Sequence, residues 1–240
     1  MDNTSYIALS RQMVLQRQMD LVANNIANAA TSGFKGQKMV FEEVLEDAGA
    51  RKPVSFVQDV GVMRDLSPGA LTTTDNPFDL AVGGDGWFTV GTQDGPRYTR
   101  NGNFMLSAEG RIVTNEGLPL LDEGGAPLTL PAGDRRIAVA RDGTVSTPAG
   151  VVGRIAPVAF ADGQQMKPIG SSLYETDEPP LPAEGASIVQ GAVEGSNVQP
   201  VLEMTRMMET VRAFQNTQRL LETHHDLVRR AVEQNLSNQA

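Results

Sequence analysis

The only two histidines of the chain, His224 and His225, are its clearest candidates for proton transfer or metal binding. They lie in a segment of helical periodicity, where adjacent residues point about 100° apart, so the two rings cannot share one metal ion. Cysteine is absent, which excludes disulfides, thiolate catalysis and cysteine-bound metal. We therefore interpret His225 as part of a helix–helix seam and His224 as a surface residue.

Glycine-rich and acidic stretches are the other groupings that could do chemistry. The run "GGDGWF" (83–88) has no following Gly-Lys-Ser/Thr and opens no helix, so it is interpreted as a turn into a strand rather than a phosphate loop. The 29 acidic residues lie beside turn glycines or in the run 175–184, which is typical of a solvated loop. Neither a calcium loop nor a Gly-x-Ser-x-Gly elbow occurs. We expect no catalytic, cofactor-binding or metal-binding residue and no enzymatic activity.

Charge and hydropathy restrict the partners. A net charge of −9 and a pI near 4.8 argue against nucleic acid. Charged residues, among them Arg11 and Arg17, interrupt any apolar core of a cleaved secretion signal. Apolar residues never run long enough to span a bilayer, so we expect no membrane insertion.

The N-terminal segment, residues 4–30, has the periodicity of an amphipathic helix. Its apolar stripe carries Ala8, Leu15, Met19, Val22, Ile26 and Ala29, with Ile7, Val14 and Leu21 on its flank. Thr31, Ser32 and Gly33 are expected to end the helix, because glycine readily takes the left-handed conformation beyond a helix C-terminus.

The C-terminal segment, about 198–235, shows apolar residues at alternating spacings of three and four, which predicts a heptad seam. Ser196 or Asn197 could cap its start, and Pro200 suits its first turn. The seam comprises Met204, Met207, Val211, Phe214, Gln218, Leu221, His225, Val228 and Val232.

Between the helices, turn pairs such as Asp94-Gly95 and Glu109-Gly110 recur every seven or eight residues, separated by short β-rich runs. The predicted fold class is mainly β with α: a discontinuous all-β module inserted between terminal amphipathic helices that pair as an antiparallel coiled coil. The expected divisions are a helical domain of 1–35 and 196–240, an extended connecting segment of 36–75, and a β-rich domain of 76–195.

Two helices cannot cover all of the apolar surface that they carry. The residues expected to stay uncovered are Ile7, Val14, Leu21, Met208, Leu220 and Leu227. Exposed apolar area on that scale marks a protein–protein surface.

Three asparagines, Asn24, Asn25 and Asn28, stand within the first helical pattern although asparagine is a mediocre helix former. Asn24 falls on the far side from Val22 and reads as a surface residue, and Asn28 falls at the edge of the apolar arc. Asn25 falls inside that arc, so we predict a buried amide, which disfavours wrong registers and partners when it is paired.

Three segments resemble the flagellar rod and hook proteins. "LVANNIANAATSGFKGQ" (21–37) is similar to their N-terminal signature, and "GAVEGSNVQPVLEMTRMMETVRAFQNTQ" (191–218) to their C-terminal one. "YTRNGNFMLSAEGRIVTNEGLPLL" (98–121) resembles their shared β-segment. "NAATSG" and "FQNTQ" depart from the usual signatures, which puts in doubt contacts made individually by Ala29, Ala30, Gln215, Asn216 and Thr217.

The resemblance implies a subunit of the axial rod that crosses the periplasm and transmits motor torque, with no cofactor. It implies export, without a cleaved signal, through the flagellar type III apparatus, and assembly with itself and with neighbouring proximal-rod and distal-rod subunits. The terminal helices would form an inner layer and the β-module an outer one. The expected subunit-interface residues are Leu15, Met19, Leu21, Val22, Asn25, Ile26, Asn28, Phe34, Met204, Met207, Val211, Phe214, Gln218, Leu221 and Val228.

Two alternatives remain open. The opening segment and the modest length favour a proximal-rod subunit, and a distal-rod subunit is the nearest competitor. A carbohydrate-binding or hydrolytic β-protein, with Trp87, Tyr98 and acidic residues along a groove, is a second class. The aromatic content of 5% argues against it, because sugar-binding surfaces depend on aromatic faces.

Overall fold

The computed structural model describes residues 3–46, 54–134 and 136–237, with side chains described from Tyr6 onward except 41–60, Val228 and 231–237. The chain divides into two compact units. Unit 1 comprises residues 1–27, 37–63 and 199–240, and unit 2 comprises residues 28–36 and 64–198. Both units are therefore discontinuous in sequence, as the predicted insertion of a β-module between terminal helices requires.

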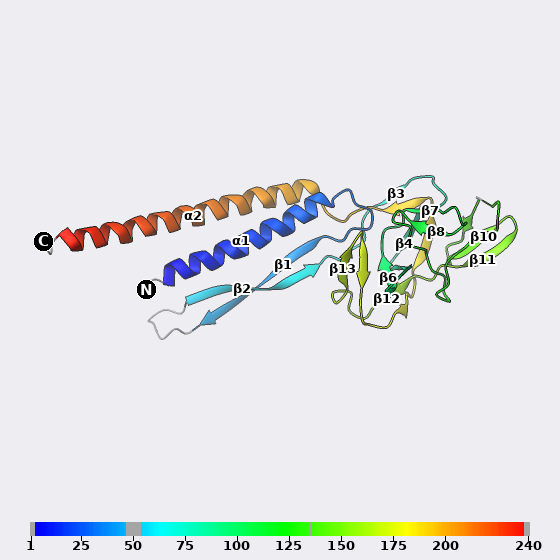
Figure 1. Ribbon diagram of the computed structural model, residues 1–240, viewed down its shortest axis with the longest axis horizontal. Helices are drawn as coiled ribbons and strands as arrows, with labels where there is room; N and C mark the ends of the chain where they lie inside the picture. Colours follow the sequence, from blue (N-terminus) through cyan, green and yellow to red (C-terminus); the bar gives the residue numbers. More distant parts are fainter. Residues whose placement is uncertain (1–2, 47–53, 135, 238–240) are drawn as a thin grey trace. The chain divides into compact units, whose positions relative to one another are not determined.

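Unit 1 contains two helices and a β-hairpin. Helix α1 spans Asn3–Ala27 and α2 spans Pro200–Ser237, and the two pack against each other. They run antiparallel, with both chain ends at the same end of the pair (Figure 1). Strands β1 (Gln37–Glu46) and β2 (Val54–Arg64) pair with each other, and β1 also packs on α1. These two strands occupy most of the segment expected to be an extended connection.

Unit 2 is built from fifteen short strands in several small sheets, within the residues that the structure describes. One sheet has the order β13-β14-β6-β5, another β11-β10-β9, and the remaining strands pair as β12-β15, β16-β4, β17-β3 and β7-β8. The strands are β3 (Leu71–Thr73), β4 (Leu80–Gly83), β5 (Phe88–Thr92), β6 (Gly95–Thr99), β7 (Phe104–Leu106), β8 (Ile112–Thr114), β9 (Ala138–Val139), β10 (Thr144–Thr147), β11 (Gly150–Arg154), β12 (Val158–Ala159), β13 (Lys167–Gly170), β14 (Leu173–Glu175), β15 (Leu181–Pro182), β16 (Ser187–Gln190) and β17 (Ala192–Glu194).

The turn glycines explain why so many short strands form here. Gly95 closes the β5–β6 hairpin and Gly110 lies in the β7–β8 turn, and both have the positive φ that glycine adopts without strain. Gly102 has a different role. A Cβ there would lie 1.5 Å from the carbonyl oxygen of Leu80, so only glycine permits this close backbone approach.

Two clusters of buried side chains form the core of unit 2. The larger one includes Phe88, Phe104 and Ile188, and the smaller one consists of Trp87, Tyr98, Met166 and Tyr174. Ile188 belongs to β16, which pairs with β4, so residues near the end of unit 2 complete a core that its first strands begin.

The ends of the helices differ from expectation in detail. Helix α1 ends at Ala27, and Gly33 further on has a φ of 68°, the left-handed conformation expected of it. Pro200 is the first residue of α2, as predicted, but neither proposed cap holds. Ser196 Oγ accepts from the N–H of Val198, and the Asn197 side chain bonds the N–H of Gly36 and carbonyls near Asp65.

Candidate functional site

The buried face of α1 follows the predicted stripe. Ala8, Leu15 and Val22, spaced seven residues apart, are buried, and Met19 and Ile26 are half-buried beside them. Leu21 and the other flanking residues, Ile7 and Val14, are also half-buried.

The buried face of α2 is not the predicted seam. Three polar residues spaced seven apart, Glu203, Thr210 and Thr217, are its buried positions among the described side chains. Met207 and Phe214 lie between them and Leu221 follows Thr217, and all three are half-buried, as residues of the predicted seam would be.

At the other described seam positions, the more buried residue is the one that precedes the predicted residue in the chain. Met204, Gln218 and His225 are exposed, which makes their assignment to the seam wrong, while Val211 is half-buried. His224 is half-buried and His225 exposed, the reverse of the predicted roles. The side chains of Val228 and Val232 lie outside the described residues.

Hydrogen bonding explains why the buried face of α2 can accommodate threonine. Thr210 Oγ1 donates to the carbonyl of Arg206 at 2.8 Å, and Thr217 Oγ1 donates to that of Ala213 at 3.0 Å. Each hydroxyl is thereby satisfied within the helix, and its methyl group remains to pack.

Asn25 is buried, as predicted, and its amide is fully engaged. Its Oδ1 accepts from the N–H of Gln37 at 2.9 Å, and its Nδ2 donates to the Gln37 carbonyl at 2.8 Å. Nδ2 also approaches Oε2 of Glu203 at 3.3 Å, and Arg206 donates to the other carboxylate oxygen. One side chain of α1 therefore ties together β1 and the first turn of α2.

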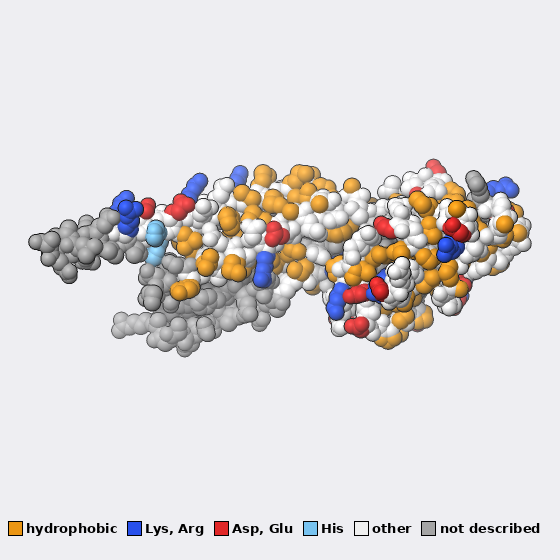
Figure 2. Space-filling view, viewed as in Figure 1, with side chains coloured by type: hydrophobic (Ala, Val, Ile, Leu, Met, Phe, Trp, Pro, Cys, Tyr) orange, Lys and Arg blue, Asp and Glu red, His pale blue; other side chains and the backbone are white. Residues whose placement is uncertain are grey.

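Large apolar side chains lie on the outside of the helix pair. Figure 2 shows hydrophobic side chains distributed along α2 on the face in view. Met208, Leu220 and Leu227 are exposed as predicted, and so are Val201, Leu202 and Met204 of α2 and Leu9 and Met13 of α1. A cavity of about 400 Å³ opens between the helices, lined by Ile7, Ala8, Arg11, Ala213, Asn216, Thr217 and Leu220.

The remaining predicted interface residues lie in unit 2. Asn28 is half-buried, and its Oδ1 accepts from Thr31 Oγ1 at 3.2 Å. Phe34 is also half-buried, and its carbonyl accepts from the N–H of Asn197 at 3.3 Å.

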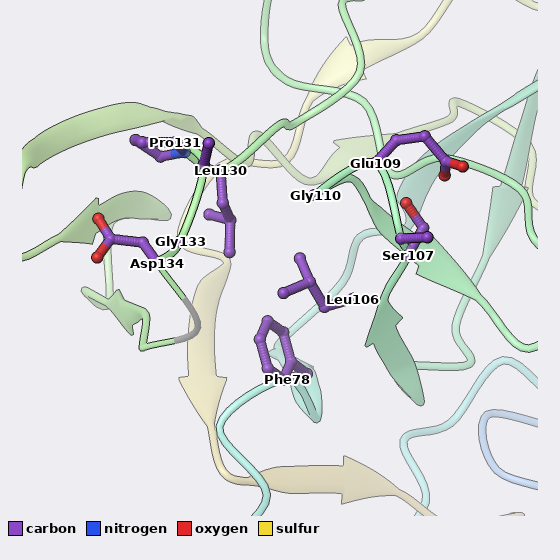
Figure 3. Close-up of a pocket in the computed structure, with 11 residues that line it drawn as sticks. Phe78, Leu106, Ser107, Glu109, Gly110, Leu130, Pro131, Gly133 and Asp134 are labelled. Carbon is purple, nitrogen blue, oxygen red and sulfur yellow. The ribbon is translucent and has the colours of Figure 1, made fainter.

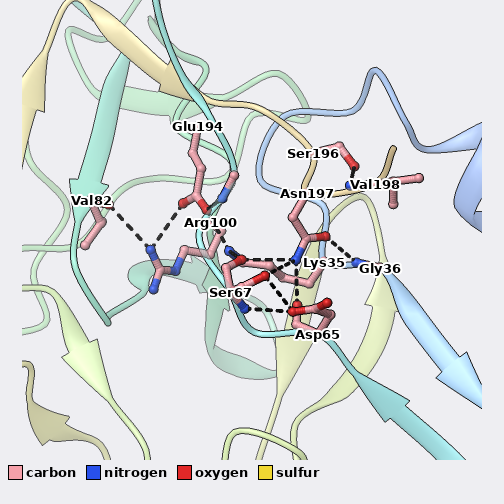
Figure 4. A network of polar contacts seen from close by, with 11 residues as sticks. Lys35, Gly36, Asp65, Ser67, Val82, Arg100, Glu194, Ser196, Asn197 and Val198 are labelled. Carbon is pink, nitrogen blue, oxygen red and sulfur yellow. Dashed lines mark hydrogen bonds and ion pairs between the residues drawn. The ribbon is translucent and has the colours of Figure 1, made fainter. Parts of the chain in front are cut away.

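Unit 2 contains a buried ionic cluster that the sequence did not predict. Lys35, Arg100 and Glu194 are each at most 4% exposed, and both cations contact the Glu194 carboxylate (Figure 4). Burial lowers the pKa of Lys35, and the hydrogen bond to Glu194 opposes that change. The three residues come from the signature segments quoted above, which is the one signal that could have pointed to them.

One cavity of unit 2 offers little chemistry. It has a volume of about 690 Å³, and Phe78, Leu106 and Leu130 point into it (Figure 3). Ser107, Glu109 and Asp134 are its hydroxyl and carboxylate residues, with no histidine or lysine among the lining residues. Across the described part of the chain, no cluster of acidic or histidine side chains is arranged to hold a metal ion.

The aromatic residues that a carbohydrate-binding groove would need are buried. Trp87 and Tyr98 are 6% and 5% exposed, and they pack with Met166 and Tyr174 in the smaller core cluster. Their ring faces are therefore unavailable to a sugar. The described helices include none long and apolar enough to cross a membrane.

Terminal helices that flank a β unit in the sequence and expose large apolar side chains are typical of a subunit that assembles with others, and comparison with known families agrees. Three family models match: flagella basal body rod protein at residues 6–35, flagellar hook protein FlgE/F/G D1 domain at 81–147, and flagellar basal body rod FlgEFG protein C-terminal at 189–234. The chain belongs to the flagellar basal-body rod and hook protein family.

Within that family, the chain is similar to the flagellar basal-body rod protein FlgF. It is 43% identical to FlgF of Caulobacter vibrioides over 97% of this chain and 98% of that protein. It is 33% identical to FlgF of Salmonella typhimurium, covering 90% and 91% of the two chains. FlgG of Bacillus subtilis is 30% identical over 95% of this chain and 97% of its own. The predicted family and the preference for the proximal-rod member are confirmed.

Proposed function

We propose that this chain is a non-enzymatic structural subunit of the flagellar basal-body rod that polymerises through the outer surfaces of α1 and α2. The observation that carries the proposal is the inverted polarity of α2. Its buried positions are Glu203, Thr210 and Thr217, whereas Met204, Met208 and other large apolar residues are exposed. A helix gains little from this arrangement in an isolated chain, because apolar burial is the main source of stability.

The distribution of charge supports the same surface. Unit 2 carries 17 acidic and 10 basic residues, whereas unit 1 carries 12 and 10. The acidic excess is therefore concentrated on the β unit, and the helical unit is close to neutral. Copies of the helices can approach one another without strong like-charge repulsion, which suits them to the packed layer of a rod.

We infer that the chain contacts copies of itself and neighbouring rod subunits, including the distal-rod protein FlgG, within the periplasm, and that the rod transmits motor torque. Contacts that repeat head to tail without closing generate a filament, which is the geometry that a rod requires. Export through the flagellar type III apparatus is part of the same proposal, and so is the interface role of the exposed and half-buried residues predicted above.

Replacing Met208 with aspartate tests the proposal. Met208 is 54% exposed, so Met208→Asp leaves the folded chain intact but places a charge on the proposed assembly surface. We expect the variant to be missing from isolated basal bodies and the cells to be non-motile. The matched control is Val151→Asp in unit 2, where an apolar residue of β11 that is 73% exposed receives the same charge.

The two variants separate the helical surface from the β unit. Incorporation of Val151→Asp with exclusion of Met208→Asp supports assembly through the helices. Normal incorporation of Met208→Asp would count against assembly through the helices. Exclusion of Val151→Asp alone would indicate that the assembly surface lies on unit 2.

A further inference from the structure

Glu194, the last residue of β17, is the point at which separate parts of unit 2 meet. Its Oε1 accepts from Lys35 Nζ at 2.6 Å and from the N–H of Gly69 at 2.8 Å. Its Oε2 accepts from Arg100 Nη1 at 3.2 Å, and its carbonyl accepts from the N–H of Gly33 at 2.8 Å. Figure 4 shows the carboxylate between the two cations.

The two cations depend on this carboxylate. Lys35 is 1% exposed and Arg100 is 4% exposed, so neither can be solvated by bulk water. Lys35 Nζ otherwise donates to the Ser67 carbonyl at 2.8 Å, with the carboxylate of Asp65 acting on it as a further charge. Arg100 Nη1 also reaches the Val82 carbonyl at 3.5 Å, the guanidinium lies 5.5 Å from the centre of the Trp87 ring, and Nε has no hydrogen-bond partner. Burying a cation without a partner charge is strongly unfavourable.

The partners of Glu194 all precede it in the chain. Gly33, Lys35, Gly69 and Arg100 belong to the first parts of unit 2, and Glu194 comes near its end. The strands repeat this order, since β17 pairs with β3 and β16 pairs with β4. Gln190, the last residue of β16, also donates to the carbonyls of Pro77 and Ile137. The last strands of unit 2 therefore close a fold whose other parts are already present.

We propose that Glu194 is the residue whose arrival allows unit 2 to fold. Until residues 187–194 are in place, folding would bury Lys35 and Arg100 without their carboxylate and leave β3 and β4 without partners. A chain that emerges N-terminus first keeps unit 2 open until nearly all of its sequence is available. This would keep the chain in an export-competent form, a consequence that rests on the proposed function, whereas the folding mechanism itself does not.

Folding and unfolding rates of the full chain in urea test the proposal. Trp87 is the only tryptophan and lies in the smaller core of unit 2, so its fluorescence reports this unit alone. Glu194→Gln keeps the shape of the side chain but removes its charge. The control is Glu175→Gln in β14, which removes a half-exposed carboxylate bonded to Arg97 at 3.1 Å in the same unit.

We expect Glu194→Gln to reduce the folding equilibrium constant at least about 100-fold, since it leaves buried cations uncompensated. If Glu194 must join before unit 2 folds, the refolding rate falls by about this factor and the unfolding rate hardly changes. Glu175→Gln should alter both rates less than about fivefold. A Glu194→Gln chain that refolds at the wild-type rate and unfolds faster would overturn the proposal.

A milder variant covers the case in which Glu194→Gln does not fold. Lys35→Met removes one cation and leaves the pair of Arg100 with Glu194 intact. Because Lys35 joins Glu194 in the same step, this change should also act on the refolding rate. An effect confined to unfolding would again contradict the proposal. None of these measurements uses a rod, so their outcome does not depend on whether the chain assembles as proposed.

Discussion

The amide of Asn25 bonds both backbone groups of Gln37, so that a side chain of α1 pairs with the first residue of β1 much as a neighbouring strand would. Asn25 is 3% exposed, and its amide also reaches Glu203 of α2. The partners of this buried amide therefore lie within the chain. Asn25 therefore acts on the proposed subunit interface indirectly, by holding α1, β1 and α2 together.

Asn25→Leu should consequently destabilise unit 1. The substitution leaves the N–H and carbonyl of Gln37 and one oxygen of Glu203 without this partner in a buried site, which costs about 2–4 kcal/mol. Thermal unfolding followed by far-UV circular dichroism measures the loss, and amide hydrogen exchange at Gln37 should accelerate. Gln215→Leu, the same type of change at an exposed position of α2, serves as the control. A more stable Asn25→Leu chain would contradict this role and leave the sequence-based prediction that the buried amide disfavours wrong registers and partners.

The seam of α2 shows the limit of reading periodicity alone. Apolar spacing finds the helix and three of its inward residues, Met207, Phe214 and Leu221, but selects Met204 where the structure buries Glu203. The error arises because the pattern assumes that the most apolar stripe faces the nearest partner. In this chain, the fully buried positions of α2 are polar and are satisfied by Asn25 and by bonds to the helix backbone, whereas Met204 and other large apolar residues are exposed.

The β unit was predictable where short-range chemistry decides the structure. Pairs such as Asp94-Gly95 locate hairpins because glycine accepts the required φ. The ionic cluster was not, because Lys35 and Glu194 are 159 residues apart and no local pattern brings them together. Their pairing is set by β17 crossing back to β3, which only the three-dimensional structure reveals.

Gly102→Ala should disrupt unit 2. The added Cβ would lie 1.5 Å from the Leu80 carbonyl oxygen and 2.7 Å from its carbonyl carbon, so the backbone itself would have to move. We expect a loss of more than about 3 kcal/mol, at the upper end for overpacking, in urea unfolding followed by Trp87 fluorescence. At Gly124, the control position, a Cβ would lie 3.3 Å from the side chain of Asp122. A Gly102→Ala chain as stable as Gly124→Ala would refute the assignment of close approach.

The β13–β14 turn stores strain that two substitutions can remove. Ser171 and Ser172 have φ of 49° and 58°, and they join Gly170 and Leu173, which are paired. A two-residue turn with two positive φ values favours Asn-Gly. Ser171→Asn with Ser172→Gly should therefore raise the free energy of unfolding of unit 2 by about 1 kcal/mol.

The β5–β6 turn provides the matched control for this change. Gln93 and Asp94 also form a two-residue connection, between Thr92 and Gly95, but neither has a positive φ. Gln93→Asn with Asp94→Gly should bring no stabilisation in the same urea titration. An equal gain from both pairs would show that the effect does not come from relief of strain in the β13–β14 turn.

Unit 2 should lose stability in alkaline solution because of Tyr174. Burial raises the pKa of this phenol above its usual value near 10, and the neighbouring Arg64 guanidinium, 4.6 Å from the ring centre, opposes the change. The folded state therefore keeps a proton that the unfolded state releases, so stability is intact below about pH 10 and falls as pH rises through the folded pKa. The lowered pKa of Lys35 gives a slope of opposite sign, but that slope is common to every variant with Lys35. Tyr174→Phe should flatten the alkaline loss measured by urea unfolding and circular dichroism, whereas Tyr6→Phe, at an exposed position of α1, should not. Parallel alkaline curves for wild type and Tyr174→Phe would mean that ionisation of this buried phenol does not limit the stability of the unit.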